Sequence, residues 1–403
     1  MKSLRFLSLL CVGTLSAGAL VAGAAVSPPQ AQAASSVRIT PNPAVASDPF
    51  EGWGTSLVWF ANATGEYPTE VRQKLFDAVF GEDGLNLNIA RYNIGGGNAT
   101  DVPSYLRPGG AVPGWWNPEL GESDDDGEIT SNYADRDRYA AAWDGENPDH
   151  YNWDADAGQR WWLDALKDKI THWEAFSNSP PYFLTQSGYV SGGINNATSE
   201  QLAPEDMAAF SSYLVNVVEE LEKAHGITFD TLDPFNEPNT DYWQTRIPNG
   251  ATWPTSASRQ EGAHIGPTRQ DQMIKALAAR LAEPGTTTDV SISAMDETNP
   301  SKFVQNWNGW SDESKGLVDQ LNVHTYGTGD RLIVRDIAKA SDKPLWMSEV
   351  EGDWNGGSGF NQTNIENGIG MATRIVDDLR ELEPTAWVFW QPVEDLYNME
   401  KVE

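Results

Sequence analysis

Cysteine is nearly absent from this chain, since Cys11 is the only one among 403 residues. A single cysteine cannot form an internal disulfide, and it leaves thiol chemistry without support elsewhere in the sequence. Basic side chains are also scarce, with 27 against 58 acidic ones and a formal net charge of −31. A charge of this sign repels phosphate backbones and anionic lipid, so nucleic acid and membrane surfaces are not expected as partners.

The motifs of several catalytic classes are missing as well. The chain has five histidines but no H-E-x-x-H zinc motif, and it has no G-x-S-x-G nucleophile elbow. The run Gly95-Gly96-Gly97 follows a candidate strand without the lysine and hydroxyl of a phosphate loop. The acidic stretch 122–127 resembles a calcium loop, but Tyr133 stands where the bidentate glutamate belongs. We therefore expect no metal and no cofactor.

Tryptophan, by contrast, is abundant, with 17 copies in the chain. The flat indole face suits stacking on rigid ligands such as sugar rings. A tryptophan-rich, strongly acidic composition therefore favours a carbohydrate ligand.

The first residues have the composition of a secretory leader. Lys2 and Arg5 precede an apolar run over 6–26, and Ala31-Gln32-Ala33 has the pattern of a cleavage site. The apolar run is also about long enough to anchor the chain in a membrane, but the cleavage site favours removal. We expect a signal peptide over 1–33 and a secreted, extracellular product without cysteine.

Short apolar segments alternate with amphipathic ones along the rest of the chain. Helices are expected over 204–223, 269–281, 331–340 and 363–382, where apolar residues recur at helical spacing. Strands are expected over 51–59, 86–93, 171–177, 229–236, 290–294, 318–325, 344–350 and 385–390. This α/β alternation predicts a parallel (β/α)8 TIM barrel, with an open doubly wound sheet as the alternative. Residues 99–156 would form a long, irregular loop on its catalytic face.

Polar residues stand at the ends of several of these strands. In a parallel barrel such ends meet at one mouth, where Glu237 and Glu349 would face each other. Paired carboxylates are what glycosidic cleavage requires, one as proton donor and one as nucleophile or base. A strand-end glutamate can instead form a salt bridge to a loop arginine. Glu351, two residues beyond Glu349, is the alternative nucleophile.

Around these carboxylates the chain resembles glycoside hydrolase family 30, and within it the endo-β-1,6-galactanase branch. Asn236-Glu237-Pro238 is similar to the family's acid/base motif, and Trp346-Met347-Ser348-Glu349 is similar to its nucleophile strand. The other segments that carry the resemblance are FEGWGTSL (50–57), ARYNIGGGN (90–98), EAFSNSPP (174–181), RQEG (259–262) and FWQP (389–392). The resemblance covers residues 37–399, and it implies Glu237 as acid/base and Glu349 as nucleophile.

The resemblance also implies supporting roles for several side chains. Arg91 would hold the carboxylate of Glu349, which Tyr326 would reach through its phenol, so that Glu349 stays ionised. His324 would lie in the same polar layer, and Asn236 would bind the sugar's 2-hydroxyl. Trp390 would form the floor of the sugar site, with a cis bond to Gln391, although it could equally belong to the barrel core. The remaining candidates for substrate contact are Asn93 and Asn178, whose amides could instead cap their own turns, and Trp115, Trp116, Trp243 and Trp354.

In activity, the resemblance implies a retaining endo-glycosidase that hydrolyses β-1,6-galactosidic linkages in galactan or arabinogalactan by double displacement. Another activity of the family, on xylan, β-1,6-glucan or β-glucosides, and a non-catalytic carbohydrate-binding protein are the alternatives. The expected domains are the leader, a segment 34–50 that supplies one strand of an accessory β-sandwich, and a barrel over 51–403. The sandwich is expected to be largely missing and the barrel to be truncated at its C-terminus. A polysaccharide is the expected partner, and the protein is expected to be a monomer.

Overall fold

The computed structural model describes residues 38–42, 49–107, 109–123, 127–352, 354 and 363–393. The chain divides into two units, Met1–Ala46 and Ser47–Glu403, and every helix and strand described here belongs to the second. The expected leader lies outside the described residues, and so does the end of the expected barrel from 394 onward. Within the expected N-terminal strand, residues 38–42 form neither helix nor strand.

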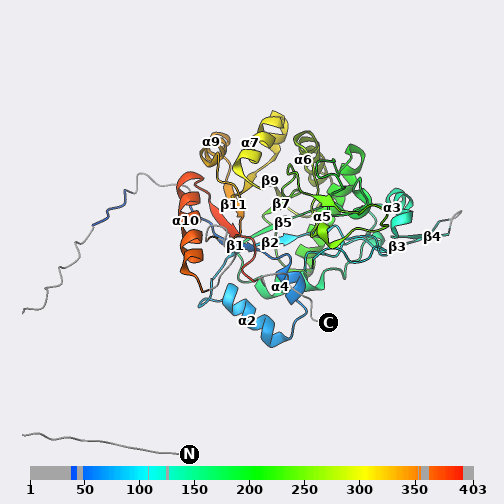
Figure 1. The fold of residues 1–403 in the computed structure, drawn as a ribbon, viewed down its shortest axis with the longest axis horizontal. Helices are drawn as coiled ribbons and strands as arrows, with labels where there is room; N and C mark the ends of the chain where they lie inside the picture. Colours follow the sequence, from blue (N-terminus) through cyan, green and yellow to red (C-terminus); the bar gives the residue numbers. More distant parts are fainter. Residues whose placement is uncertain are drawn as a thin grey trace, which may run out of the picture. The chain divides into compact units, whose positions relative to one another are not determined.

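Eight parallel strands close into a barrel, which confirms the predicted fold (Figure 1). Each of the eight predicted strands is found, shortened at one or both ends except for the fifth, which runs longer. The strands are β1 (Gly52–Ser56), β2 (Ile89–Asn93), β5 (His172–Phe176), β7 (Thr231–Asp233), β9 (Ser291–Glu297), β10 (Gln320–His324), β11 (Leu345–Glu349) and β12 (Ala386–Phe389). Their order around the barrel is β1-β12-β11-β10-β9-β7-β5-β2, the simple sequential order of a (β/α)8 fold.

Helices surround the strands and cover the outer face of the barrel (Figure 1). They are α1 (Phe60–Thr64), α2 (Thr69–Val79), α3 (Arg136–Ala142), α4 (Ala157–Leu166), α5 (Met207–His225), α6 (Pro267–Leu281), α7 (Pro300–Gly309), α8 (Asp312–Leu317), α9 (Arg331–Ser341) and α10 (Ile365–Glu381). The predicted apolar face of α5 is buried in the core, with Phe210, Leu214 and Val217 fully inaccessible. The helix ends at Gly226, whose positive φ of 65° suits a residue without a side chain.

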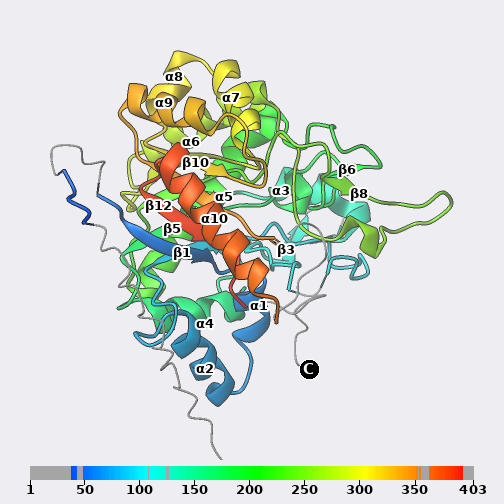
Figure 2. The ribbon, with the colours of Figure 1, turned by 60° about the vertical axis from the view of Figure 1, so that its left-hand side comes forward.

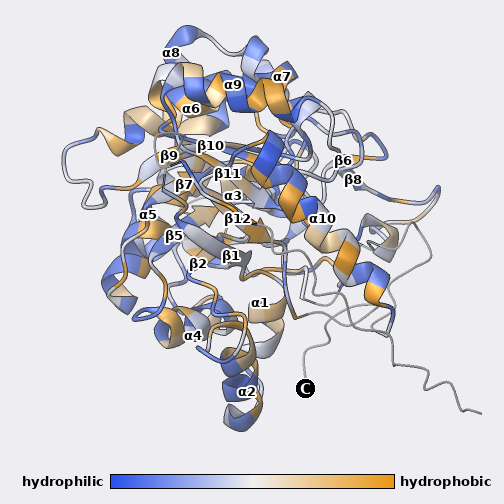
Figure 3. Cartoon of the chain, turned by 90° about the vertical axis from the view of Figure 1, so that its left-hand side faces the viewer, coloured by the Kyte–Doolittle hydropathy of each residue, from blue (hydrophilic) through white to orange (hydrophobic). Residues whose placement is uncertain are grey.

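The apolar stripe of α10 is largely exposed, in contrast to that of α5. Ile365 is 75% exposed, Ile369 58% and Leu379 38%, whereas Leu382 just beyond the helix is buried. The helix lies along the outside of the barrel, and apolar segments are visible on its outer surface (Figures 2 and 3). The helix was therefore predicted correctly, but not the side of it that meets the barrel.

The segment between β2 and β5 is more regular than expected. It contains α3, α4 and an antiparallel hairpin of β3 (Glu119–Ser123) and β4 (Gly127–Thr130). A second small sheet pairs β6 (Gly193–Ile194) with β8 (Gln244–Thr245). No helix among the described residues is long and apolar enough to cross a membrane.

The interior of the barrel changes from apolar to polar along its axis. Ile89, Trp346, Ala386 and Val388 form one buried apolar cluster inside the closed sheet. Two residues further along β2 comes the fully buried Arg91. Since alternate residues of a strand face the same side, the strands carry apolar side chains into one end of the barrel and charged ones into the other. The charged end is where the strands terminate.

Candidate active site

A buried arginine lies at the centre of the polar layer. Arg91, in β2, donates through Nε to Oε1 of Glu174 at 2.7 Å and through Nη2 to Oδ2 of Asp296. Its Nη1 donates to the carbonyl of Ser348 at 3.0 Å and lies 3.7 Å from Oε2 of Glu349. Three carboxylates therefore surround one guanidinium, which is how a buried cation is compensated.

Two buried aspartates of this layer differ in their titration. Burial and the charges of Asp296 and Glu174 raise the pKa of Asp233 well above its usual value. Burial acts on Asp296 as well, but Arg91 and His324 outweigh it and lower the pKa of that carboxyl. Asp296 is thus the ionised anchor of the layer, and Asp233 retains its proton over a wider pH range.

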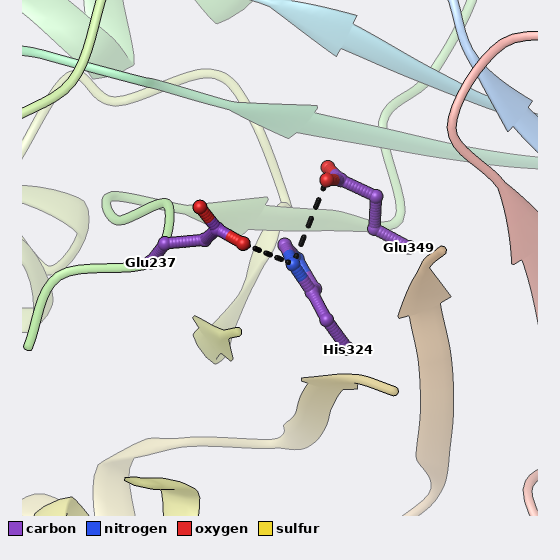
Figure 4. A group of neighbouring side chains, drawn as sticks. All are labelled: Glu237, His324 and Glu349. Carbon is purple, nitrogen blue, oxygen red and sulfur yellow. Dashed lines mark hydrogen bonds and ion pairs between the residues drawn. The ribbon is translucent and has the colours of Figure 1, made fainter. Parts of the chain in front are cut away.

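His324, at the end of β10, lies between the two candidate catalytic carboxylates, Glu237 and Glu349 (Figure 4). It also contacts Asp296. Its Nε2 lies 2.8 Å from Oδ1 of Asp296, and its Nδ1 lies 3.2 Å from Oε1 of Glu237 and 3.6 Å from Oε1 of Glu349. Burial lowers the pKa of His324, but Glu349 and Asp296 outweigh it and raise that pKa well above its usual value. A charged imidazolium can donate from both nitrogens, as these carboxylate partners require.

An irregularity in the sheet places Glu349 inside the barrel. Val323 of β10 pairs with Met347 of β11, yet the next residue, His324, pairs with Glu349. The register thus skips Ser348, whose hydroxyl donates to Asp296 at 2.6 Å. In a regular strand, Ser348 and Glu349 would face opposite sides, so the bulge brings two consecutive side chains into the polar layer.

The surroundings of Glu349 confirm the contacts expected for it, but they also raise its pKa. Tyr326 donates its phenol to Oε1 at 3.0 Å, and Arg91 is an ion-pair partner of Oε2. Burial and the charge of Glu237 raise the pKa of Glu349 to about 7, although His324 and Arg91 act in the opposite direction. Burial thus opposes the expected ionisation of Glu349, and the charges of His324 and Arg91 favour it.

Glu237 follows β7 in a left-handed backbone conformation, with φ at 46°. A side chain other than glycine adopts this region only when its surroundings hold it there. The backbone N–H of Glu237 donates to the carbonyl of Asp296 at 2.8 Å, and its own carbonyl accepts from Nε1 of Trp243 at 2.9 Å. Tyr242 donates its phenol to Oε2 of the Glu237 side chain.

The two carboxylates come close enough to act on one bond. One oxygen of Glu237, one oxygen of Glu349 and a ring nitrogen of His324 lie within 4.8 Å of one another. A divalent metal can bind at such a spacing, but a charged imidazolium offers an N–H rather than a lone pair. Together with the donors Arg91 and Tyr326, the group fits an acid/base and nucleophile pair better than a metal centre.

The amide side chains of Asn93, Asn178 and Asn236, which were expected to bind hydroxyl groups, are buried and have polar atoms without a partner among the described residues. Neither polar side-chain atom of Asn93 makes a hydrogen bond within the described part of the chain, and the same is true of Oδ1 of Asn178 and of Asn236. Buried amides without partners are uncommon in folded proteins and call for a functional or solvent partner. Substrate contact by these residues stays a prediction.

Trp390 lies in a small buried cluster at the end of β12. It is 4% exposed and meets Trp59 edge-on, with ring centroids 5.0 Å apart, beside Val112 and Phe176. The peptide bond between Trp390 and Gln391 is trans, so the prediction of a cis bond there is wrong. The close ring contact holds the indole without it. Its role as the floor of a sugar site stays a prediction.

The tryptophans expected to stack on sugars at the mouth are mostly core residues. Trp115 is 1% exposed, and Trp116 and Trp243 are each 5% exposed. Trp354 is half-buried, with the guanidinium of Arg374 5.1 Å from its ring centre. The long segment after β2 folds into a packed layer to which Trp115 and Trp116 belong, and Trp116 also lines a cavity together with Tyr105. Sugar stacking by these rings stays a prediction.

Several residues of the site escaped the sequence analysis, and Asp296 and Tyr242 are the ones that contact His324 or a candidate catalytic carboxylate. Asp296 was missed because the expected strand stopped at Ala294, whereas β9 continues to Glu297 and turns Asp296 into a strand-end residue. A polar pair at the end of an apolar strand was the available signal. Tyr242 carried no signal beyond its proximity to Glu237. Glu351, the alternative nucleophile, is not part of the group formed by Glu237, His324 and Glu349.

A closed (β/α)8 barrel with two acidic side chains at the carboxyl ends of its strands places the protein among the glycoside hydrolases. The chain belongs to O-glycosyl hydrolase family 30, whose model matches residues 97–324.

Two curated relatives extend the match over most of the chain. An exo-β-1,6-galactobiohydrolase of Bifidobacterium longum is 38% identical over 424 residues, which cover 90% of this chain and 27% of the relative. An endo-β-1,6-galactanase of Hypocrea rufa is 27% identical over 360 residues, which cover 86% of this chain and 65% of the relative. The chain thus spans about a quarter of the first relative and somewhat under two thirds of the second.

Solved structures agree with the fold. The catalytic domain of the family 30 xylanase C from Talaromyces cellulolyticus has a TM-score of 0.58 at 18% identity and covers 89% of this chain and 71% of its own. A conserved exported protein from Bacteroides fragilis has a TM-score of 0.61 at 19% identity and covers 85% of this chain and 69% of its own. At these identities the likeness establishes the barrel and carries no information on substrate.

Proposed function

We propose that this chain hydrolyses β-1,6-galactosidic linkages in galactan or arabinogalactan. The observation that carries the proposal is that both curated relatives, each matched over most of this chain, are named for cleavage of this linkage. One relative is named for exo and the other for endo action. We propose endo action, and exo action is the second candidate because the relative with the higher identity has it.

In the first proposed step, Glu349 attacks the anomeric carbon of the sugar. Glu237 gives its proton to the glycosidic oxygen, so that the bond from that oxygen to the anomeric carbon breaks and the leaving sugar departs as an alcohol. Arg91 and Tyr326 hold the attacking carboxylate in place. Asn236 would bind the 2-hydroxyl, a contact that strengthens as positive charge develops on the ring.

In the second step, Glu237 acts as a base. It takes a proton from water, whose oxygen attacks the anomeric carbon and displaces Glu349, and the configuration of the sugar is retained. Retaining enzymes hold their carboxyl groups about 5–5.5 Å apart, against about 6.5–9.5 Å when a water must fit between them. The approach of Glu237 and Glu349 oxygens to within 4.8 Å supports the retaining class.

We also propose that the protein is secreted. The positive, apolar and small-residue pattern over 1–33 supports export. A polysaccharide substrate is consistent with action outside the cell.

The test is a panel of polysaccharides incubated with the wild-type chain and with its Glu349→Gly variant. We expect reducing ends from β-1,6-galactan and from arabinogalactan whose arabinose has been trimmed, and none from the variant. A ladder of oligosaccharides indicates endo action, and a single short product indicates exo action. Hydrolysis of xylan or β-1,6-glucan without hydrolysis of galactan would overturn the proposal, and so would galactan binding without product release.

A further inference from the structure

Tyr242 is an exposed tyrosine whose hydroxyl turns back onto the acid/base candidate. Its side chain is 46% exposed, yet its phenol donates to Oε2 of Glu237. The other carboxylate oxygen, Oε1, faces Nδ1 of His324. Both oxygens of Glu237 therefore have a donor, one from the barrel and one from the loop after β7.

The loop that carries Tyr242 is firmly attached to the barrel. Trp243 is buried and donates to the carbonyl of Glu237, and its ring packs on Gly262, where a β-carbon would come within 2.2 Å of the indole. Thr240 donates its hydroxyl to the same carbonyl at 3.0 Å. The ring of Tyr242 rests against Trp243 at 4.6 Å between centroids. The backbone is thus fixed, and the phenol is presented to Glu237 by a rigid frame.

We propose that Tyr242 is a positioning residue that assists acid catalysis by Glu237, an inference that rests on the glycosidase roles proposed above. As Glu237 releases its proton to the leaving oxygen, negative charge develops on its carboxylate. A phenol donor on Oε2 stabilises that charge more than it stabilises the neutral acid, so it lowers the barrier of the step.

Several other charged or titratable groups face Glu237. They are His324 at the end of β10, Tyr326 in the loop that follows it, Glu349 of β11, and Asp296 and Glu297 of β9. A substitution at Tyr242 leaves all of them in place. A change in the pH dependence of kcat/KM after such a substitution can therefore be attributed to loss of the phenol.

The test compares Tyr242→Phe with wild type on substrates that differ in leaving group. For galactan, whose leaving sugar needs a proton, we expect kcat/KM to fall about 10- to 100-fold, within the range of general acid catalysis. For a 2,4-dinitrophenyl β-galactobioside, which leaves without a proton, we expect a loss below about threefold. On galactan, the alkaline limb of the kcat/KM profile should move to higher pH, because the carboxylate has lost a donor.

Tyr326→Phe is the matched control, since it removes a phenol from Glu349 instead. It should slow both substrates alike, because nucleophilic attack is common to them. Unchanged melting of Tyr242→Phe would show that the ring still packs on Trp243. Equal losses on both substrates, or an unshifted alkaline limb, would overturn the inference. If wild type proves to cleave another glycan, the same comparison with aryl glycosides of that sugar tests Tyr242 separately from the proposed substrate.

Discussion

The two candidate catalytic carboxylates are held in different ways, although both are buried. Glu349 belongs to β11, between two neighbouring strands, and it faces a buried guanidinium and a phenol. Glu237 follows β7 in a left-handed backbone conformation, and its side chain meets an imidazole and a half-exposed phenol. One is therefore held by the sheet and a buried cation, and the other by a loop.

The difference corresponds to the work proposed for each. A nucleophile keeps one role, and the cation near Glu349 favours the ionised form that attacks. An acid/base must alternate between protonated and ionised forms, and a neutral phenol imposes less charge than a guanidinium. His324 contacts both carboxylates through Nδ1, and Asp296 binds the opposite ring nitrogen, Nε2. The predictions that follow separate these contributions.

Removal of either carboxylate should have the largest effect. Glu349→Gly and Glu237→Ala should each lower the rate on galactan about 1,000-fold or more, because each deletes an essential participant. On an aryl glycoside, whose leaving group departs without a proton, added azide should restore turnover in both variants, with α-glycosyl azide from Glu349→Gly and β-glycosyl azide from Glu237→Ala. Product configuration determined by NMR is the measurement.

Glu351→Ala is the control for this assignment, since it removes the alternative nucleophile. We expect little loss from it. An initial product of inverted configuration from wild type, or a larger loss from Glu351→Ala than from Glu349→Gly, would contradict the assigned roles.

The aspartate beneath both carboxylates should matter next. Asp296→Asn removes the charge that holds Arg91 and His324, and we expect kcat to fall about 10- to 100-fold, as when a supporting partner of a catalytic group is lost. Asp233→Asn is the matched control, because burial raises the pKa of Asp233 and a neutral amide resembles its protonated form. Its loss should stay below about threefold. Equal losses from the two variants would show that Asp296 acts only through packing.

Much of the fold was predictable from the sequence because the strands of a parallel barrel are short, apolar and regularly spaced. The eight expected strands form the barrel, and Glu237 and Glu349 come together at its mouth. Arg91, His324 and Tyr326 also reach these carboxylates. Alternation and strand-end polarity carry this information, since both are local patterns.

What was missed depends on tertiary detail. The bulge that turns Ser348 and Glu349 to the same side follows from pairing with β10, which no local pattern reports. The apolar stripe of α10 predicted a helix but not which residues would meet the barrel, and Ile365 is in fact exposed. The pKa of Glu349 depends on burial, which spacing along the chain does not measure.

The pH dependence of kcat/KM should sharpen the contrast between the two carboxylates. Since burial raises the pKa of Glu349 to about 7, the nucleophile is protonated below that pH and the rate should fall on the acidic side. Tyr326→Phe removes a donor from the carboxylate, so its acidic limb should move to higher pH, whereas Tyr242→Phe should leave that limb in place. The profiles are measured with an aryl substrate. A flat wild-type profile between about pH 5 and about pH 8 would contradict the prediction.

The last prediction concerns stability rather than rate, and it involves Glu261, a buried carboxyl that has neither the cation of Glu349 nor the phenol of Glu237. The N–H of Gly97 donates to its Oε1 at 3.4 Å, and its Oε2 makes no hydrogen bond within the described residues. Burial raises the pKa of Glu261 from 4.5 to about 8. Because this pKa is higher in the folded state than in the unfolded state, the folded state binds the proton more tightly. The resulting stability is fully present below about pH 4.5 and is lost as the pH rises to about 8.

Glu261→Gln removes this titration while it keeps the shape of the side chain. The melting temperature of wild type should therefore fall relative to that of Glu261→Gln as the pH rises from about 5 to about 8.5. Glu70→Gln, at an exposed position of α2, is the control and should follow wild type at every pH. If the melting temperatures of wild type and Glu261→Gln change with pH in the same way, the Glu261 carboxyl ionises as readily in the folded chain as in water. Burial alone would then not account for the raised pKa of Glu349, and the contrast between the two catalytic carboxylates would have to rest on their charged neighbours.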